Sequence, residues 1–328
     1  MKKFLEKFVE KKNFNKKLFT PGPASLLAEN LSSIEPCFGR GDQNYEKIEN
    51  YVLNKLKKMT DHKYIARMQG AASLALEVMI NNFIYGNILI IKTGIYSDRL
   101  FSMVKSSKIN FGKIKKIVYI DYKDIDKINK NFDWIVACSV ETSIALKISI
   151  LELKKLKKKH NAKLALDATA SIGLENFHEY ADVLGYSSCK GLFGMTGAAF
   201  IAFNKLPNNK INQFNLNIFN HLDKKMTGPY HAIYSLYDVL KNHNDFKYSV
   251  KINKKFFLKK MKEYLIYDFN QQPNLCTFIN KKIKKKDKKV ILYKSRADIS
   301  GSVICHLGEV HLKKKAKGKI IESILLVD

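Results

Sequence analysis

The chain has 328 residues, of which 46% are hydrophobic, so it can fold around a sizeable core. Lys and Arg number 58 against 30 Asp and Glu, and the formal net charge of +28 would suit binding to nucleic acid or to an anionic membrane. Only four of these basic residues are Arg: Arg40, Arg67, Arg99 and Arg296. Base recognition relies on the bidentate guanidinium group, which Lys lacks. The charge therefore indicates a lysine-rich background and argues against specific nucleic-acid binding.

Five scattered cysteines without a CxxC spacing argue against a disulfide framework or a structural zinc site, so we expect no metal centre. No apolar run is long enough to span a bilayer. Residues 1–17 lack the continuous apolar core of a signal peptide, and we predict a cytoplasmic protein. Phe4, Leu5, Phe8 and Val9 have helical spacing, which predicts an amphipathic helix. We expect it to pack on the protein or on a second subunit rather than on a membrane surface.

Short apolar runs alternate with helix-like segments through the middle of the chain. Strands are predicted at 87–91, 116–120, 134–137, 163–166, 181–185 and 198–203, and helices at 73–83 and 150–160. This alternation is typical of an α/β domain with a mostly parallel sheet. Beyond residue 252 the pattern becomes less regular, with strand-like runs at 290–293 and 302–306. We therefore predict an N-terminal helix over 1–17, a large domain over 18–251 and a small α+β domain over 252–328.

Two segments next to the predicted elements suit charged groups: one would bind an anion and the other a cation. Ala71 and Ala72 lead through Ser73 into a helix, and a helix start with free backbone N–H groups can hold a phosphate. Taken alone, this loop favours an ordinary helix start over a phosphate site. Asp167 ends a buried strand, where a carboxylate needs a partner. A pyridinium nitrogen would serve, as in pyridoxal phosphate (PLP) enzymes; alternatively, Asp167 caps the following turn.

Two further loops carry a nucleophile and hydroxyl groups. Lys190 follows Ser187 and Ser188 and precedes a glycine, and such small, apolar surroundings suit a lysine that forms Schiff bases. Residues 139–143 follow another strand and offer hydroxyls and a carboxylate to a polar ligand. Because ligands of parallel sheets bind beyond the carboxyl ends of the strands, we expect these loops to meet at one site.

In this order, the loops resemble those of the class V aminotransferases, PLP-dependent enzymes of fold type I. The resemblance begins at the TPGP motif of residues 20–23, runs to about Leu240 and continues more faintly to Gly308. Segments 38–42 and 227–231 are similar to parts of the 2-aminoethylphosphonate–pyruvate transaminases, and alanine/serine–glyoxylate transaminases are similar as well. The resemblance implies the fold type I architecture with a trimmed C-terminal domain, bound PLP, and a homodimer with shared active sites.

The resemblance also implies roles for residues around the PLP ring. Lys190 would form the Schiff base with PLP and then move a proton as general base and acid. Asp167 would pair with the pyridine nitrogen. Tyr96 stands where the family stacks an aromatic ring on the cofactor, although a buried core tyrosine is the alternative. Thr142 would contact the phenolic oxygen.

A second implied group holds the phosphate. The backbone N–H groups of Ala71 and Ala72 and the hydroxyl of Ser73 would bind it, with help from Ser187. Thr227 would reach the phosphate of the neighbouring subunit.

One departure from the family leaves the substrate open. Val303 stands where these transaminases have an arginine that binds the substrate carboxylate, a task that suits the bidentate guanidinium. We regard Arg296 and Arg40 as candidate replacements, although a surface role for Arg296 fits as well.

Three functions compete at this point. The first is a PLP-dependent aminotransferase that moves an amino group, by a ping-pong mechanism, from an amino acid or aminophosphonate to an oxo acid or aldehyde. A partner like 2-aminoethylphosphonate would be anionic, which agrees with the basic charge. The second is other fold type I chemistry, such as a cysteine desulfurase or other lyase, or a decarboxylase. The third is a non-enzymatic polyanion binder that uses lysine runs such as 154–159 and 281–289.

Overall fold

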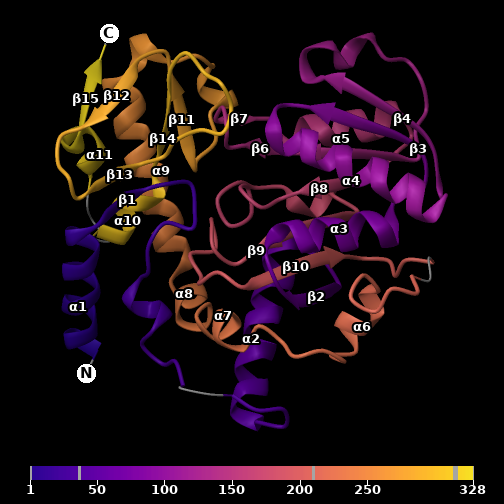
Figure 1. Cartoon of the computed structure of the whole chain (residues 1–328), viewed down its shortest axis with the longest axis horizontal. Coiled ribbons are helices and arrows are strands. Elements are labelled where there is room, and N and C mark those ends of the chain that lie inside the picture. Colours follow the sequence, from indigo (N-terminus) through magenta and orange to yellow (C-terminus); the bar gives the residue numbers. More distant parts are fainter. Residues whose placement is uncertain (1, 36–37, 209–210, 313–316, 328) are drawn as a thin grey trace.

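The computed structural model describes residues 2–35, 38–208, 211–312 and 317–327 (Figure 1). At its centre lies a seven-stranded sheet with the order β2-β10-β9-β8-β5-β3-β4. The strand β10 runs opposite to the other six strands, and all pairs that do not include β10 are parallel. The predicted mostly parallel α/β fold is therefore confirmed. The strands are β2 (Tyr64–Gln69), β3 (Gly86–Lys92), β4 (Ile114–Asp121), β5 (Trp134–Cys138), β8 (Lys163–Asp167), β9 (Val183–Ser187) and β10 (Ala198–Phe203).

The central strands are apolar on both faces because helices cover both sides of the sheet. In β5, for example, Ile135 and Val136 point into two different hydrophobic clusters. One cluster includes side chains of α2 (Gln43–Thr60) and α5 (Ile150–Lys159). The other includes side chains of α3 (Ala72–Phe83) and α4 (Ile95–Phe111). The helices cover the faces of the sheet but not the carboxyl ends of its parallel strands, so the loops at these ends are free to form a binding site.

Several short elements lie outside the central sheet and the four helices named above. They are β6 (Val140–Glu141), β7 (Leu146–Lys147), α6 (Ile218–Leu222), α7 (Tyr230–Tyr234) and α8 (Tyr237–Lys241). The C-terminal elements are α9 (His243–Lys260), β11 (Cys276–Ile279), β12 (Lys282–Lys285), β13 (Val290–Leu292), β14 (Ser302–Cys305), α10 (Leu307–Leu312), α11 (Lys319–Ser323) and β15 (Ile324–Val327).

The C-terminal strands form small separate pairs, β11 with β14 and β12 with β15, both antiparallel. The strand β13 instead pairs in parallel with β1 (Lys17–Phe19), so the beginning of the chain is joined to its C-terminal part (Figure 1). The boundary expected after residue 251 falls inside α9, and the division into domains stays a prediction.

The N-terminal helix α1 (Lys2–Asn15) packs on α10 through a narrower face than the sequence predicts (Figure 1). Val9 is buried, and the side-chain amide of Asn13 donates to the carbonyl oxygen of His311 at 2.7 Å. Phe4 and Phe8, expected on the packed face, are 74% and 47% exposed. The contact stripe therefore follows Val9 and Asn13, which lie one turn apart. Among the described residues, no helix is both long and apolar enough to cross a membrane.

Candidate active site

A cavity of about 280 Å³ lies beyond the carboxyl ends of β5, β8 and β9. Its wall includes Cys138, Asp167 and Ser187, which are the last residues of these three strands. The structure brings nine of the residues predicted for the site to this one cavity: Ala71, Ala72, Ser73, Tyr96, Thr142, Asp167, Ser187, Lys190 and Arg296.

Asp167 places a carboxylate in the floor of the cavity. Its side chain is 5% exposed, and its Oδ1 accepts a hydrogen bond from the backbone N–H of Thr169 at 2.9 Å. Burial raises the pKa of Asp167, and the bonds from Thr169 and the charges of Lys190 and Arg99 oppose this rise. A buried carboxylate of this kind is suited to a cationic partner such as a protonated pyridine nitrogen.

Lys190 lies in the tight turn after β9, where its carbonyl oxygen accepts from the N–H of Phe193 at 2.9 Å. Its amine is 5.5 Å from the ring centroid of Tyr96. Its aliphatic stem packs against Gly22, where an added Cβ would lie only 2.8 Å from the Cγ of Lys190. Gly22 also has a φ of +111°, so the TPGP segment needs glycine here to close one side of the cavity.

Tyr96 is held at the start of α4 by a carboxylate distant in sequence. The Oε2 of Glu141 accepts the backbone N–H of Tyr96 at 2.9 Å, and its Oε1 accepts the N–H and the hydroxyl of Ser143. Burial raises the pKa of Glu141, and these hydrogen bonds oppose the rise. The sequence suggested that this carboxylate serves a ligand. Instead it is used within the protein, where it positions Tyr96.

Replacing Glu141 with Gln is therefore expected to lower the free energy of unfolding by about 1–3 kcal/mol, because the amide leaves buried donors without an acceptor. The loss of alignment at Tyr96 should also weaken PLP binding. Thermal unfolding and a PLP titration would measure both effects. Glu152→Gln is the matched control, because Glu152 accepts a backbone N–H at the start of α5 in an exposed position. Equal effects of the two substitutions would contradict the role of Glu141.

The start of α3 lines another part of the cavity and offers backbone N–H groups. Ala71 precedes this helix and offers no side-chain cap, so the first backbone N–H groups are left for another acceptor. Ala72 and Ser73 open a helix of 12 residues whose dipole also favours an anion. Ser187 is buried nearby. This arrangement fits a phosphate group.

A polar atom in the wall also fits a bound cofactor. The hydroxyl oxygen of Thr142 is buried and has no hydrogen-bond partner in the structure. Because buried hydroxyls are nearly always bonded, this oxygen calls for a polar group of a ligand. Together with Asp167, Lys190 and the start of α3, it matches the substituents of PLP.

Thr227 and Arg40 do not line this cavity in the chain described here. Arg40 is exposed in the loop before α2. Thr227 borders a neighbouring cavity of about 370 Å³ together with Arg67. The adjacent Gly228 packs on the guanidinium of Arg67, to which an added Cβ would approach within 2.6 Å. The role of Thr227 in a second subunit stays a prediction.

Arg67 is itself fixed by a buried charge network that the sequence did not reveal. Its Nε donates to Glu49 Oε1 at 2.6 Å, and Lys224 pairs with the other oxygen of the same carboxylate. The hydroxyl of Tyr45 also bonds to Glu49. The network thus provides a rigid base for the segment that contains Thr227.

Two arginines reach the active-site cavity, and one of them was not predicted. Arg99 lines it, with its guanidinium carbon 5.2 Å from the ring centroid of Tyr96. The available signal was its spacing of three residues after Tyr96, which places both on one face of α4. Arg296 is held near the site because the hydroxyl of Ser295 donates to the carbonyl oxygen of Ser143 at 2.6 Å. Val303, in contrast, is buried in a hydrophobic cluster.

Comparison with known proteins gives distant but consistent matches. No model of a known protein family matches the sequence. A bifunctional phosphonoacetaldehyde hydrolase/aminoethylphosphonate transaminase of Clostridioides difficile is 25% identical over 343 residues, covering 90% of this chain and 54% of that protein. A 2-aminoethylphosphonate–pyruvate transaminase of Bacillus mycoides is 22% identical over 302 residues, covering 80% and 82%. The chain spans only 54% to 59% of the length of the first four curated relatives that it matches.

Solved structures match the fold over most of the chain. A phosphoserine aminotransferase of Cytophaga hutchinsonii has a TM-score of 0.77 at 12% identity, covering 94% of this chain and 97% of that one. An alanine–glyoxylate aminotransferase of Nostoc sp. has a TM-score of 0.74 at 14% identity, covering 93% and 95%. The fold is therefore that of these aminotransferases.

Proposed function

We propose that this chain, which is similar to class V-type aminotransferases in sequence and shares the fold of solved aminotransferases, is a PLP-dependent aminotransferase. The observation that carries the proposal is the meeting of Asp167, Lys190 and the uncapped start of α3 in one cavity. These three features come from segments far apart in the sequence, and each suits a different part of PLP.

When bound, PLP supplies an electron-poor ring that accepts the electron pair left on the substrate Cα after loss of its proton. Asp167 would keep the ring nitrogen protonated, and the start of α3 with Ser73 would bind the phosphate. Tyr96 would pack beside the ring, and Thr142 would offer its hydroxyl to a polar substituent. Lys190, whose amine lies on the Tyr96 side of the cavity, would serve as the base that takes the proton from the substrate Cα and as the acid that returns it.

The substrates in this proposal are anionic amino donors and oxo acceptors. Arg296 and Arg99 both line the cavity, and together with Lys190 they surround it with positive charge. Two guanidinium groups suit a substrate with a carboxylate or phosphonate group, such as an amino acid or 2-aminoethylphosphonate. The names of the curated relatives support the second choice.

We further propose that the protein acts as a cytoplasmic homodimer. The cysteines Cys138, Cys189, Cys276 and Cys305 are free thiols, as expected in a reducing compartment. The position of Thr227 on a separate cavity, braced by Arg67, suits a segment that completes the site of a second subunit.

The lyase alternative needs a reactive thiolate, and the structure does not favour one at Cys305 or Cys276. Cys305 lies in β14, is fully buried, and burial raises the pKa of its thiol well above the ordinary value. Cys276, which is opposite Cys305 in the paired strand β11, also has its thiol pKa raised by burial, to about 12. Both thiols are therefore protonated near neutral pH.

Arg296→Ala is expected to raise KM for the amino donor about 10- to 100-fold with a smaller change in kcat, because a charged hydrogen bond to the substrate is lost. Steady-state kinetics with one fixed acceptor would measure this change. Arg40→Ala is the control, since Arg40 does not line the cavity. If Arg296→Ala left KM unchanged, Arg296 would have no part in substrate binding.

A panel of amino donors tests the proposed function. The PLP-loaded protein would be mixed with 2-aminoethylphosphonate, alanine, serine or cysteine, and the cofactor product would be identified. Formation of pyridoxamine phosphate together with an oxo product supports transamination. Sulfide release from cysteine would support the lyase instead, and decarboxylated products would support a decarboxylase.

A further inference from the structure

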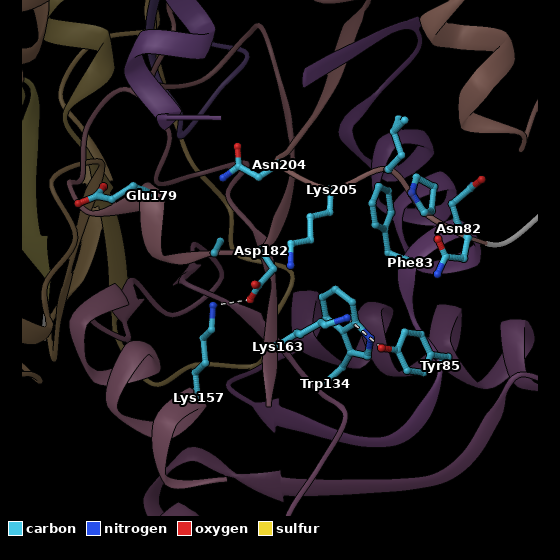
Figure 2. A pocket seen from close by; sticks show the side chains of 14 residues that line it. Asn82, Phe83, Tyr85, Trp134, Lys157, Lys163, Glu179, Asp182, Asn204 and Lys205 are labelled. Atoms are coloured by element: carbon cyan, nitrogen blue, oxygen red, sulfur yellow. Dashed lines mark hydrogen bonds and ion pairs between the residues drawn. The ribbon is translucent and has the colours of Figure 1, made fainter. Parts of the chain in front are cut away.

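A second cavity, of about 630 Å³, opens at the opposite edge of the central sheet (Figure 2). The strands β5 and β8 connect the two regions: Trp134 pairs with Lys163 where they begin, and Cys138 pairs with Asp167 where they end. Strands of this length span roughly 13–17 Å, so the two cavities are separate. We call this second space the basal cavity and define it by Phe83, Tyr85, Trp134, Lys163, Lys205 and Leu206.

Aromatic side chains form one wall of the basal cavity. The rings of Tyr85 and Trp134 meet edge to face, with their centroids 6.2 Å apart and an angle of 88° between their planes. Phe83 and Leu206 add apolar surface beside them. Tyr85 and Leu206 are exposed, whereas Trp134 and Phe83 are only 3% and 7% exposed, so Tyr85 and Leu206 form the part of this wall that is open to a ligand. Such a corner of rings suits a planar, apolar group.

Lys163 places a positive charge over this wall. Its amine donates to the hydroxyl of Tyr85 at 2.9 Å, and it lies 5.2 Å and 5.4 Å from the ring centroids of Tyr85 and Trp134 (Figure 2). The nearby Lys157 is different, because it is paired with Asp182 at 2.5 Å. Among the described residues, Lys163 forms no ion pair with a carboxylate, so its charge is available to an anion.

A third observation is independent of the charge. The indole nitrogen of Trp134 is buried, and its N–H has no hydrogen-bond partner among the residues that the structure describes. Buried donors without acceptors are uncommon, and each calls for an explanation. The exposed Lys163 side chain lies over this ring, so an acceptor group of a ligand that pairs with Lys163 is brought next to the indole.

We propose that the basal cavity binds a small planar anion, namely an aromatic or heteroaromatic carboxylate. Its ring packs against the exposed side chains of Tyr85 and Leu206, next to the edge of Trp134, and its carboxylate pairs with Lys163. Lys157 and Asp182 neutralise each other, and Lys205 adds a second positive charge to the wall. Glu179 also lines the cavity, but in Figure 2 it lies away from Lys163 and the rings. The charge next to the rings is therefore positive.

Nicotinate and nicotinamide provide a matched pair of probes, because they share a planar ring and differ in charge. Trp134 is the only tryptophan of the chain, so all tryptophan fluorescence comes from the wall of this cavity. For the PLP-loaded protein we expect saturable quenching by nicotinate, with calorimetry giving the same affinity. Nicotinamide should bind at least about tenfold more weakly, because it cannot form the charge-assisted bond.

Substitutions then locate the binding. Lys163→Gln should weaken nicotinate binding about tenfold. Lys55→Gln is the control and should have no effect, because Lys55 also lies over a tyrosine ring, 5.5 Å from the centroid of Tyr51, but outside the cavity. Lys190→Ala should also leave the affinity unchanged, which separates this site from the active site whether or not the protein is an aminotransferase.

Any of the following outcomes overturns the proposal. The first is the absence of saturable binding up to about 10 mM nicotinate, a concentration at which even a weak site fills. The second is equal affinity for nicotinate and nicotinamide. The third is a Lys163→Gln variant that binds like Lys55→Gln, or a Lys190→Ala variant that loses binding.

Discussion

Lys190→Ala is expected to abolish the visible absorbance band of the PLP-loaded protein and to reduce transamination by at least about 10⁴-fold. The substitution removes both the covalent attachment of PLP and the group that moves the proton, and general acid–base catalysis alone contributes about 10²–10⁴-fold. Spectra before and after borohydride treatment, together with single-turnover rates, would measure the two losses.

Two controls make the Lys190 experiment specific. Lys55→Ala removes an exposed lysine outside the cavity and should behave as wild type. Unfolding curves should show that Lys190→Ala is folded, because Lys190 lies in the cavity wall rather than in a hydrophobic cluster. A variant that retained the band would mean that another lysine holds the cofactor.

Asp167→Asn is expected to have effects of opposite sign on activity and on the stability of the cofactor-free protein. Breaking a buried ion pair by removing one partner costs about 3–5 kcal/mol, so activity with PLP should fall by roughly 10²–10⁴-fold. Without PLP, the carboxylate of Asp167 is buried with one backbone hydrogen bond and no cofactor nitrogen beside it. Removing its charge should then raise Tm by a few degrees at neutral pH.

The pH dependence supplies a check on Asp167. Burial raises its pKa above the ordinary 3.8, so the folded state holds this proton more tightly than the unfolded state does. The contribution of Asp167 to stability is therefore present at low pH and is lost as the pH rises through its folded-state pKa. The stability difference between Asp167→Asn and wild type should shrink as the pH falls towards 3.8. A difference independent of pH would contradict this account of Asp167.

Six of the seven strands of the central sheet could be predicted because each contains a largely apolar run, and such runs are a local signal. The edge strand β2 was not predicted, because Arg67 interrupts its apolar residues. The run 198–203 coincides with β10, whereas the run 181–185 corresponds to β9, which begins two residues later at Val183. The loops after the strands were predicted as one site because the carboxyl ends of parallel strands meet at one edge. The structure brings those loops together around Asp167 and Lys190.

Contacts between distant segments were out of reach. The bond from Tyr96 to Glu141 joins residues 45 positions apart, and the sequence gives no sign that this carboxylate serves a helix rather than a ligand. Arg67 and Lys224 meet on Glu49 for the same reason. The face of α1 was misjudged because helical spacing identifies an apolar stripe but not how much of it a partner covers.

The most direct measurement is mass spectrometry of the PLP-loaded protein after borohydride reduction and proteolysis. The chain contains 58 lysines and arginines, only four of them arginine, so nonspecific labelling would be spread over many peptides. The account predicts reduced PLP on the peptide that contains Lys190, at one equivalent per chain. Reduced PLP on other lysines, or none at all, would contradict the central claim that Lys190 and Asp167 form a PLP site.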